Sequence, residues 1–239
     1  MKKVRLIISF LLNLILPKFC VNCEREGSYF CKDCLIFLSE SNFICPACQK
    51  SSYFGNRHKS CPKLKKLDGL INIWDYDGPI KEAIHKIKYE GLFDILGEIL
   101  EQTIYVLEED SFRFSVFLSF LTDEKTLITF VPTNPANYKE RGFDQAKLLA
   151  DQLARALKKP TSVLLKKNRN TKSQTGLNKE ERLINVKDSF SFISQGNQVI
   201  ERAVLVDDVW TSGATMQECC RILKNNGLKE VWGLTIAKA

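Results

Sequence analysis

Two adjacent carboxylates, Asp207 and Asp208, stand between an apolar run, Ala203–Val206, and a short turn rich in hydroxyl groups. A helix is expected to begin at about Ala214, directly after that turn. Hydroxyl groups, main-chain N–H groups and the positive end of a helix together make a cradle for a phosphate. The residues of this cradle are Thr211, Ser212, Gly213, Ala214 and Thr215. Gly213 allows a ligand to approach the backbone closely, so the pattern predicts a phosphate site at the carboxyl end of a strand.

Carboxylates beside a phosphate cradle would repel the phosphate unless another group lies between them. A ribose would fill that place, because its hydroxyls can donate to Asp207 and Asp208 while its 5′-phosphate reaches the turn. Mg²⁺ would screen the remaining negative charge. The alternative is an acidic pair that merely precedes an ordinary helix, but the complete strand, acid pair, turn and helix favour a sugar phosphate.

Seven of the nine cysteines fall within a stretch of 42 residues, together with one histidine. These eight ligands form four close pairs with two residues between the members, a spacing that lets both side chains face one metal ion. Eight ligands of this kind predict two structural zinc sites. The eight residues are Cys20, Cys23, Cys31, Cys34, Cys45, Cys48, His58 and Cys61. Sequential pairing into two groups of four is the simplest arrangement, and an interleaved pairing stays open.

This segment has two other interpretations. A disulfide framework is disfavoured because seven cysteines are an odd number and no convincing export signal precedes them. His58 could be an ordinary surface residue, which would leave the second site incomplete. Cys219 and Cys220 lie far from the others, in a predicted helix, and we expect them to pack in the core.

The remainder of the chain alternates between apolar strand patterns and amphipathic helix patterns. The predicted strands are Leu70–Tyr76, Thr126–Val131, Thr161–Leu165, Ala203–Val206 and Val231–Ala237. The predicted helices are Gly78–Tyr89, Phe93–Leu107, Phe143–Leu157 and a last one from about Ala214 to Asn225, and a loop is expected over Lys166–Asp188. Such alternation with uniformly apolar strands predicts an α/β fold with a parallel sheet flanked by helices.

The formal net charge of +7 comes entirely from the first third of the chain. Residues 1–69 carry 12 basic and 5 acidic side chains, whereas residues 70–239 carry 23 of each. We therefore expect a basic zinc-ribbon module with an N-terminal helix over 1–69 and an α/β domain over 70–239. The apolar segment Leu6–Leu16 is too short to span a bilayer. Docking on the second domain and weak contact with a membrane or another protein both stay open for it, and a cytoplasmic location is expected.

The strand with its acid pair and turn resembles the signature of type I phosphoribosyltransferases, and the whole chain resembles the ComF family, associated with DNA uptake and natural competence. The matching motifs are Ile87-Lys88-Tyr89-Glu90-Gly91, Val131-Pro132, Arg141-Gly142-Phe143-Asp144-Gln145 and a basic segment with Arg169, Thr171, Gln174, Leu177, Arg182, Asn185 and Phe190, besides the paired cysteines. The family usually has Asn where this chain has Asp144, Arg near Asn137 and Cys at His58.

The resemblance implies that phosphoribosyl pyrophosphate and Mg²⁺ bind at Asp207, Asp208 and the Thr211–Thr215 turn. It implies catalytic roles for the two aspartates and a pyrophosphate-side loop that begins at Pro132 and Thr133. The basic segment Lys166–Lys187 would be a lid over the ligand or a contact for nucleic acid, or else a plain solvated loop. The residues singled out there are Arg169, Lys172, Gln174 and Arg182.

Two classes of function follow from the resemblance. The first is a phosphoribosyltransferase that acts on an acceptor, in support of DNA uptake or in nucleotide salvage unrelated to it. The second is a catalytically inactive protein that binds single-stranded DNA and uses phosphoribosyl pyrophosphate as a regulatory ligand. Both require the same ligand site, and they differ in whether pyrophosphate is released.

Overall fold

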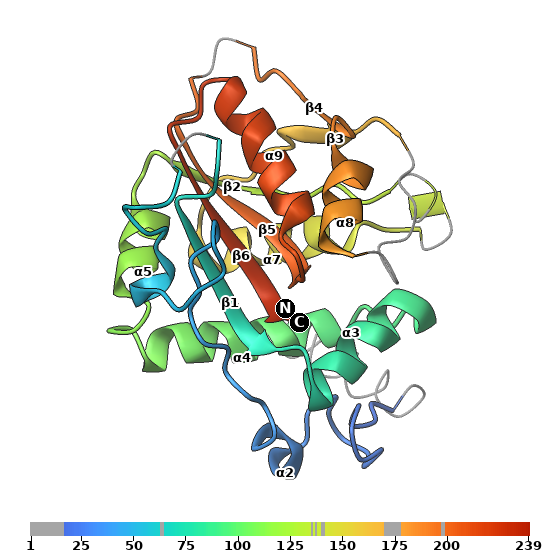
Figure 1. Ribbon diagram of the computed structural model, residues 1–239. Coiled ribbons are helices and arrows are strands. Elements are labelled where there is room, and N and C mark those ends of the chain that lie inside the picture. The colour runs from blue at the N-terminus through green and yellow to red at the C-terminus, as the bar shows by residue number, and fades with distance from the viewer. Residues whose placement is uncertain are drawn as a thin grey trace.

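A four-stranded parallel sheet forms the centre of the computed structural model (Figure 1). The structure describes residues 17–62, 65–134, 136, 138–139, 142–169, 178–196 and 199–239. Across the sheet the strands run in the order β1 (Gly69–Asp75), β6 (Glu230–Lys238), β5 (Arg202–Trp210) and β2 (Thr126–Phe130). All three pairings are parallel, which confirms the predicted α/β architecture.

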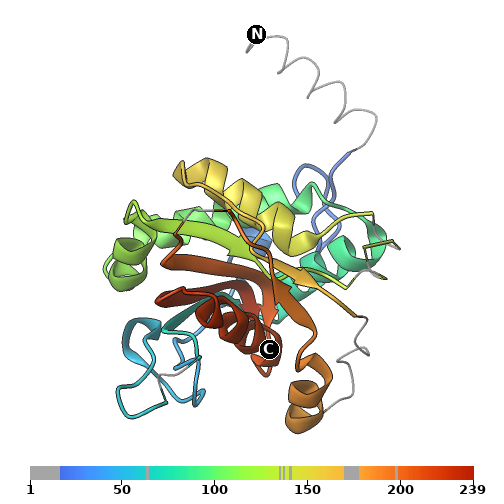
Figure 2. The same cartoon turned by 90° about the horizontal axis from the view of Figure 1, so that it is seen from above.

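Helices cover both faces of this sheet (Figure 2). One face carries α4 (Ile95–Glu109), α5 (Ser115–Thr122) and α7 (Gln145–Leu157), and the other carries α9 (Ala214–Asn225). Successive side chains of a strand point to opposite faces. Accordingly Val204 and Val206 of β5 pack in the core with α7, while Ala203 and Leu205 pack in the core with α9.

Strand β5 extends further than its apolar residues predict. β5 continues through Asp207 and Asp208 to Trp210, because β6 pairs with it as far as Lys238. The two aspartates therefore lie within the strand and not just after it. Helix α9 matches its predicted bounds of Ala214 and Asn225. Helix α3 (Gly78–Glu90) follows β1, and Gly91, in the left-handed conformation, ends it.

The predicted loop over Lys166–Asp188 is wrong in part. A helix, α8 (Lys179–Val186), lies within it, and Asn178 and Glu181 form a capping box at its start. The strands on either side of this segment, β3 (Leu165–Lys167) and β4 (Phe190–Phe192), pair as a short antiparallel ribbon. The strand predicted at Thr161–Leu165 is also misplaced, since Thr161 makes only an isolated bridge to Ile128 before β3 begins at Leu165.

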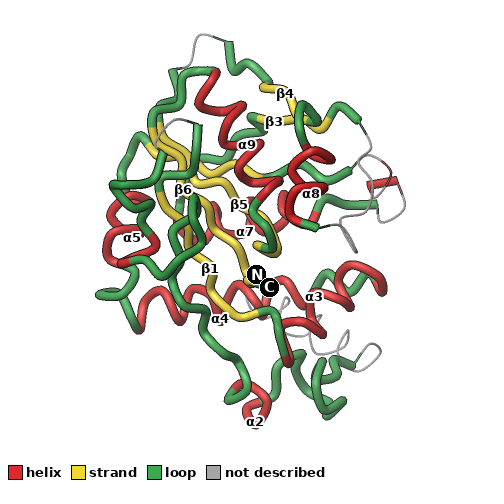
Figure 3. Tube along the Cα trace, in the orientation of Figure 1, coloured by secondary structure: helices red, strands yellow, loops and turns green. Residues whose placement is uncertain are grey.

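The cysteine-rich segment is mostly irregular backbone, as Figure 3 shows. It contains the short helix α2 (Lys32–Leu35) and the 3₁₀ turn η1 (Tyr53–Gly55). Its middle part lies along the edge strand β1, where Ser41 donates from its backbone N–H to the carbonyl of Ile73 at 2.9 Å. This contact covers the otherwise unpaired edge of the sheet. The division into units 1–69 and 70–239 stays a prediction.

The apolar segment Leu6–Leu16 lies outside the described residues. Among the residues that are described, no helix combines the length and the apolar composition that crossing a bilayer requires.

Gly69, the first residue of β1, lies against the indole of Trp232 in β6. A Cβ atom at this position would lie 2.4 Å from two ring carbons of that buried tryptophan. We expect Gly69→Ala to lower the free energy of unfolding by about 1–3 kcal/mol, because the core must shift to admit the methyl group. Gly97→Ala in α4 is the matched control, since its Cβ would meet no atom within 4 Å. That variant should instead gain about 0.5–1 kcal/mol. Denaturant unfolding of both variants tests this, and a neutral Gly69→Ala would contradict it.

Candidate functional site

The acid pair lies at the carboxyl edge of the sheet, between the turn before α9 and the end of β2. Asp207 stands opposite Thr235 of β6, and both aspartates are half-buried. Just beyond β2, Val131 donates from its backbone N–H to the carbonyl of Val206 at 2.9 Å. This hydrogen bond brings Pro132 and Thr133, which follow Val131, beside the acid pair. The structure thus brings together the two parts of the predicted phosphoribosyl site.

Lys88, from the last turn of α3, forms an ion pair with Asp208. Its Nζ lies 2.6 Å from Asp208 Oδ2, and the two side chains are 22% and 18% exposed. Burial alone would lower the pKa of Lys88, but the charge of Asp208 and its hydrogen bond outweigh burial and raise it. The ammonium therefore stays charged in the site. The sequence placed Lys88 in a family motif without a role, because nothing local connects it to Asp208.

Asp144 fixes the loop that begins at Pro132. One carboxylate oxygen accepts from the backbone N–H of Thr133 at 2.8 Å, and the other accepts from Lys147 at 3.1 Å as the N-cap of α7. Asparagine has a single oxygen, so it could accept only one of these bonds in this arrangement. Burial raises the pKa of Asp144 against the effect of these N–H donors, and the nearby charge of Asp208 adds to the rise.

Negative charge is in excess around Asp207. Burial raises the pKa of this carboxyl well above its usual range, and repulsion from Asp208 adds to the effect, while Lys88 opposes both. On another side lie Lys167 of β3, whose pKa burial lowers, and the buried thiol of Cys219 in α9. Three carboxylates therefore lie near one another at this edge of the sheet, and Lys88 forms an ion pair with one of them, an arrangement suited to a cationic or hydroxyl-rich ligand.

The turn between β5 and α9 is held in a tight conformation. Gly213 adopts a φ of +75°, and a Cβ on it would lie 2.2 Å from the indole of Trp210. The hydroxyl of Ser212 accepts from the backbone N–H of Ala214 at 3.4 Å. A helix cannot satisfy the N–H groups of its own first turn, and its dipole attracts anions there. The turn is therefore built as the sequence predicts for an anion cradle.

The cysteines and His58 gather in sequential groups of four. Their ligand atoms lie within 4.8 Å of one another in each group, one formed by Cys20, Cys23, Cys31 and Cys34, the other by Cys45, Cys48, His58 and Cys61. The interleaved pairing does not occur. Burial would raise the pKa of the Cys20 thiol, but backbone N–H groups lower it to about 6, and the same balance brings Cys45 to about 7. Each group thus contains one thiol with a lowered pKa, and a metal ion binds the thiolate form.

His58 belongs to the second group through its side chain. Its Nε2 lies 3.0 Å from the carbonyl oxygen of Ser51 and its Nδ1 lies 3.3 Å from the sulfur of Cys48. A carbonyl can only accept, so Nε2 carries the proton and Nδ1 offers its lone pair to the group. A backbone partner that fixes the ring in this way is typical of metal-ligating histidines. The residues of both groups could thus hold a metal ion.

Comparison with known proteins bears on this arrangement. Residues 144–238 match the family model described as the phosphoribosyl transferase domain. The chain is 30% identical over 218 residues to competence protein F of Haemophilus influenzae, an alignment that covers 82% of this chain and 91% of that protein. The chain belongs to the ComF family.

Other relatives support this assignment. Competence protein ComFC of Bacillus subtilis is 25% identical over 218 residues, which cover 87% of this chain and 82% of that protein. DNA utilization protein YhgH of Escherichia coli K12 is 27% identical over 220 residues, which cover 90% and 87%. These alignments extend well beyond the phosphoribosyl transferase domain. The family resemblance stated from the motifs is confirmed.

Two of the four residues predicted in the basic segment can be placed. Arg169 donates to the carbonyls of Asn185 and Lys187 at 3.2 and 3.0 Å, so it caps the end of α8. Arg182 lies on α8 and is half-buried. Lys172, Gln174 and the family-motif residue Arg141 lie outside the described residues. The role of this segment as a lid stays a prediction, and α8 lies within it.

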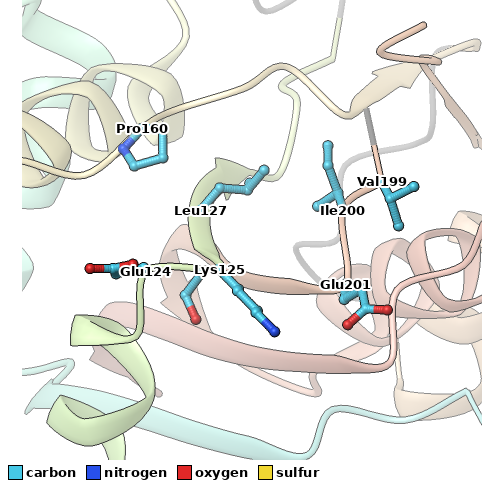
Figure 4. Close-up of a pocket in the computed structure, with 8 residues that line it drawn as sticks. Glu124, Lys125, Leu127, Pro160, Val199, Ile200 and Glu201 are labelled. Atoms are coloured by element: carbon cyan, nitrogen blue, oxygen red, sulfur yellow. The ribbon is translucent and has the colours of Figure 1, made fainter. Parts of the chain in front are cut away.

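A cavity of about 420 Å³ lies at the opposite edge of the sheet, where β2 and β5 begin (Figure 4). Apolar Leu127 and Ile200 line it together with charged Lys125 and Glu201. Ligands of parallel sheets bind at the carboxyl ends of the strands, which this cavity does not adjoin. Its lining also contains neither the turn nor the acid pair, so we assign the chemistry to the edge with Asp207 and Asp208.

The raised pKa of Asp207 gives a pH-dependent prediction. A carboxyl with a higher pKa in the folded chain favours folding while it is protonated, and this contribution is lost as pH rises through the folded pKa. We therefore expect Asp207→Asn to raise the melting temperature more at pH 8 than at pH 5, by about 2–4 °C or more, the shift that about 1 kcal/mol produces.

Circular dichroism melts in buffer without divalent cations measure this difference. Glu101→Gln, on the exposed side of α4, is the control and should change the melting temperature alike at both pH values. An Asp207→Asn variant whose effect is independent of pH would contradict the charge excess.

Proposed function

We propose that the chain binds phosphoribosyl pyrophosphate together with Mg²⁺ at the carboxyl edge of its sheet. The observation that carries this proposal is the junction of Asp207 and Asp208 with the turn before α9. Carboxylates accept the ribose hydroxyls, and the turn, Thr211–Thr215, binds the 5′-phosphate through hydroxyls and main-chain N–H groups. Both features occur in one continuous stretch of chain, at the edge where parallel sheets bind ligands.

The charge balance of the site supports a divalent cation. Asp207 and Asp144 both have raised pKa values because negative charge and burial coincide there. Carboxylate oxygens are the ligands that Mg²⁺ prefers, usually in part through water and the phosphates of the substrate. When bound, Mg²⁺ would neutralise charge on the pyrophosphate. Asp207 and Asp208 are the residues that would hold it on the ribose side.

The loop after β2 would contact the pyrophosphate side of the ligand. Pro132 and Thr133 would bind the pyrophosphate, and Asp144 would hold this loop through its bond to the Thr133 N–H. Lys88 contributes a positive charge to the site through its ion pair with Asp208. Its ammonium could also pair with phosphate oxygens, which would offset the repulsion between the ligand and the acid pair.

The activity that this site would support is phosphoribosyl transfer. An acceptor forms a bond to the anomeric carbon, the bond from that carbon to pyrophosphate breaks, and pyrophosphate leaves with the electron pair while the acceptor loses a proton. Asp207 and Asp208 would stabilise positive charge that develops on the sugar. The alternative, a regulatory role for the ligand without turnover, uses the same contacts.

We further propose that each group of four ligands holds one structural Zn²⁺. Thiolates and one imidazole in tetrahedral sets without an open position are typical of structural zinc. Metal-bound, reduced cysteines also favour action in the cytoplasm.

We propose single-stranded DNA as the macromolecular partner, in line with the relatives called competence protein or DNA utilization protein. Tyr53 and Phe112 are 89% and 80% exposed beside the second group of ligands, and Phe54 packs against Phe112 at 6.1 Å. Lys50 and Lys59 are exposed in the same segment. Aromatic rings with nearby cations are what unstacked bases and their phosphates bind. The chain would thus support DNA uptake during natural transformation.

The ligand proposal is tested by the double variant Asp207→Ala with Asp208→Ala. We expect it to abolish Mg²⁺-dependent binding of phosphoribosyl pyrophosphate in calorimetry, because both carboxylates that accept the ribose are gone. Asp151→Ala, an acidic residue on α7 outside the site, should bind as the natural chain does. Unchanged binding by the double variant would refute the site. Pyrophosphate release with a panel of acceptors then separates transfer from regulation.

The DNA proposal is tested by salt and by aromatic substitution. Affinity for single-stranded DNA should fall with salt, with a logarithmic slope of about −0.7 per phosphate contacted. Tyr53→Ala and Phe112→Ala should each weaken binding by about 5-fold or more, in line with about 1–3 kcal/mol per stacked base. Phe37→Ala, an exposed aromatic near the first group, is the control. A flat salt response, or equal losses in all three variants, would count against this partner.

A further inference from the structure

The segment that carries the second group of ligands contacts the Thr211–Thr215 turn, here called the phosphate turn. Its first two ligands lie in the turn Cys45–Cys48, and Gln49 follows them. The side-chain amide of Gln49 donates from Nε2 to the carbonyl oxygen of Ser212 at 2.8 Å. Ser212 lies in the middle of the turn that would bind the 5′-phosphate. A residue next to a metal ligand therefore fixes the backbone of the proposed ligand site.

A second side-chain amide, that of Gln217 in α9, donates in the opposite direction, from the helix to the cysteine turn. Gln217, in the first turn of α9, is 8% exposed and donates from Nε2 to the carbonyl of Pro46 at 2.7 Å. Its Oε1 accepts from the backbone N–H of Leu67 at 3.3 Å. Pro46 stands between Cys45 and Cys48. Two amides thus connect the cysteine turn with both the phosphate turn and the first turn of the helix that follows.

The first group provides an internal comparison. Glu24 follows Cys23 as Gln49 follows Cys48, and both adopt the left-handed conformation, with φ of +59° and +62°. Their N–H groups donate to the carbonyls of Cys20 and Cys45 at 2.9 and 2.8 Å. The backbone of the two turns is therefore alike, but Glu24 is exposed whereas Gln49 reaches Ser212.

The segment that carries the first group of ligands contacts α4. The carboxylate of Glu98 in α4 accepts from the N–H groups of Tyr29 and Phe30 at 2.8 and 3.1 Å and pairs with Lys18 at 3.0 Å. Helix α4 lies on the face of the sheet opposite to α9 (Figure 2). A metal in the first group would stabilise that attachment, and a metal in the second group would stabilise the phosphate turn.

We infer that Gln49 and Gln217 are positioning residues that couple metal binding by the second group to ligand binding at the Thr211–Thr215 turn. A metal ion that holds Cys45 and Cys48 together fixes the turn between them, and the two amides transmit that geometry to Ser212 and to the start of α9. Coupling free energies are reciprocal, so a ligand on the phosphate turn retains the metal of the second group. The ligand part of this inference rests on the proposed function.

Hydrogen exchange without any ligand tests the coupling itself. In zinc-loaded full-length chain we expect Cys48→Ser to leave one zinc and to speed amide exchange in a peptide over 211–217 by about 5-fold or more. Cys23→Ser also leaves one zinc but should not change that peptide. Gln49→Ala keeps both zinc ions and should speed exchange as Cys48→Ser does, whereas Glu24→Ala should not. Equal exchange in Gln49→Ala, Glu24→Ala and the natural chain, at two zinc ions each, would overturn the inference.

Zinc release tests the reciprocal effect. With a chromophoric chelator, phosphoribosyl pyrophosphate and Mg²⁺ should slow release from the second group by about 5-fold or more in the natural chain and in Glu24→Ala. That protection should vanish in Gln49→Ala. Retained protection in Gln49→Ala would overturn the inference. If the natural chain binds no phosphoribosyl pyrophosphate but exchange still responds to Gln49→Ala, the proposed ligand falls while the coupling stands.

Discussion

The burial of negative charge at the end of β5 is the constraint on which the rest of the structure depends. Asp207, Asp208 and Asp144 converge where water is scarce, and repulsion between them would open the sheet edge without compensation. The compensation comes from distant parts of the chain. Helix α3 brings the ammonium of Lys88, and α7 with the loop after β2 supplies N–H groups to Asp144. Folding stability is thus given up at this edge, where the proposed cation and sugar-phosphate ligand would offset the negative charge.

Local sequence was sufficient to predict those elements whose structure depends on residues nearby in the chain. The apolar strand, the acid pair, the glycine turn and α9 follow one another without interruption, so their order and the bounds of α9 could be predicted. The close cysteine pairs were predicted in the same way, but the choice of sequential over interleaved grouping came from the structure. The end of β5 could not be predicted, since its polar final residues stay in the strand through pairing with β6. Helix α8 was missed because its polar sequence has little apolar periodicity, although Asn178 and Glu181 signal its start.

Contacts between remote residues left no signal in the sequence. Lys88 lies at the end of a helix whose buried side is marked by Ile80, Ile84 and Ile87, and nothing nearby in sequence announces a carboxylate for it. Gln49 and Ser212 are 163 residues apart, and a glutamine after a cysteine pair is unremarkable by itself. Asp144 was visible only as a departure from the family pattern. Its two oxygens, each used by a different N–H group, give that departure a physical reason.

The two cysteine turns have the same local structure but contact different parts of the fold. The two turns have the same backbone hydrogen bond, and the residue after each cysteine pair is left-handed in both. Their local backbone structure therefore does not distinguish them. The difference lies in what each turn packs against, α4 for the first and the start of α9 for the second. A metal ion in the first position can support only the fold. A metal ion in the second position supports the backbone that forms an anion cradle. The second half of a segment that looks like a separate module in the sequence therefore contacts the turn and helix of the proposed ligand site.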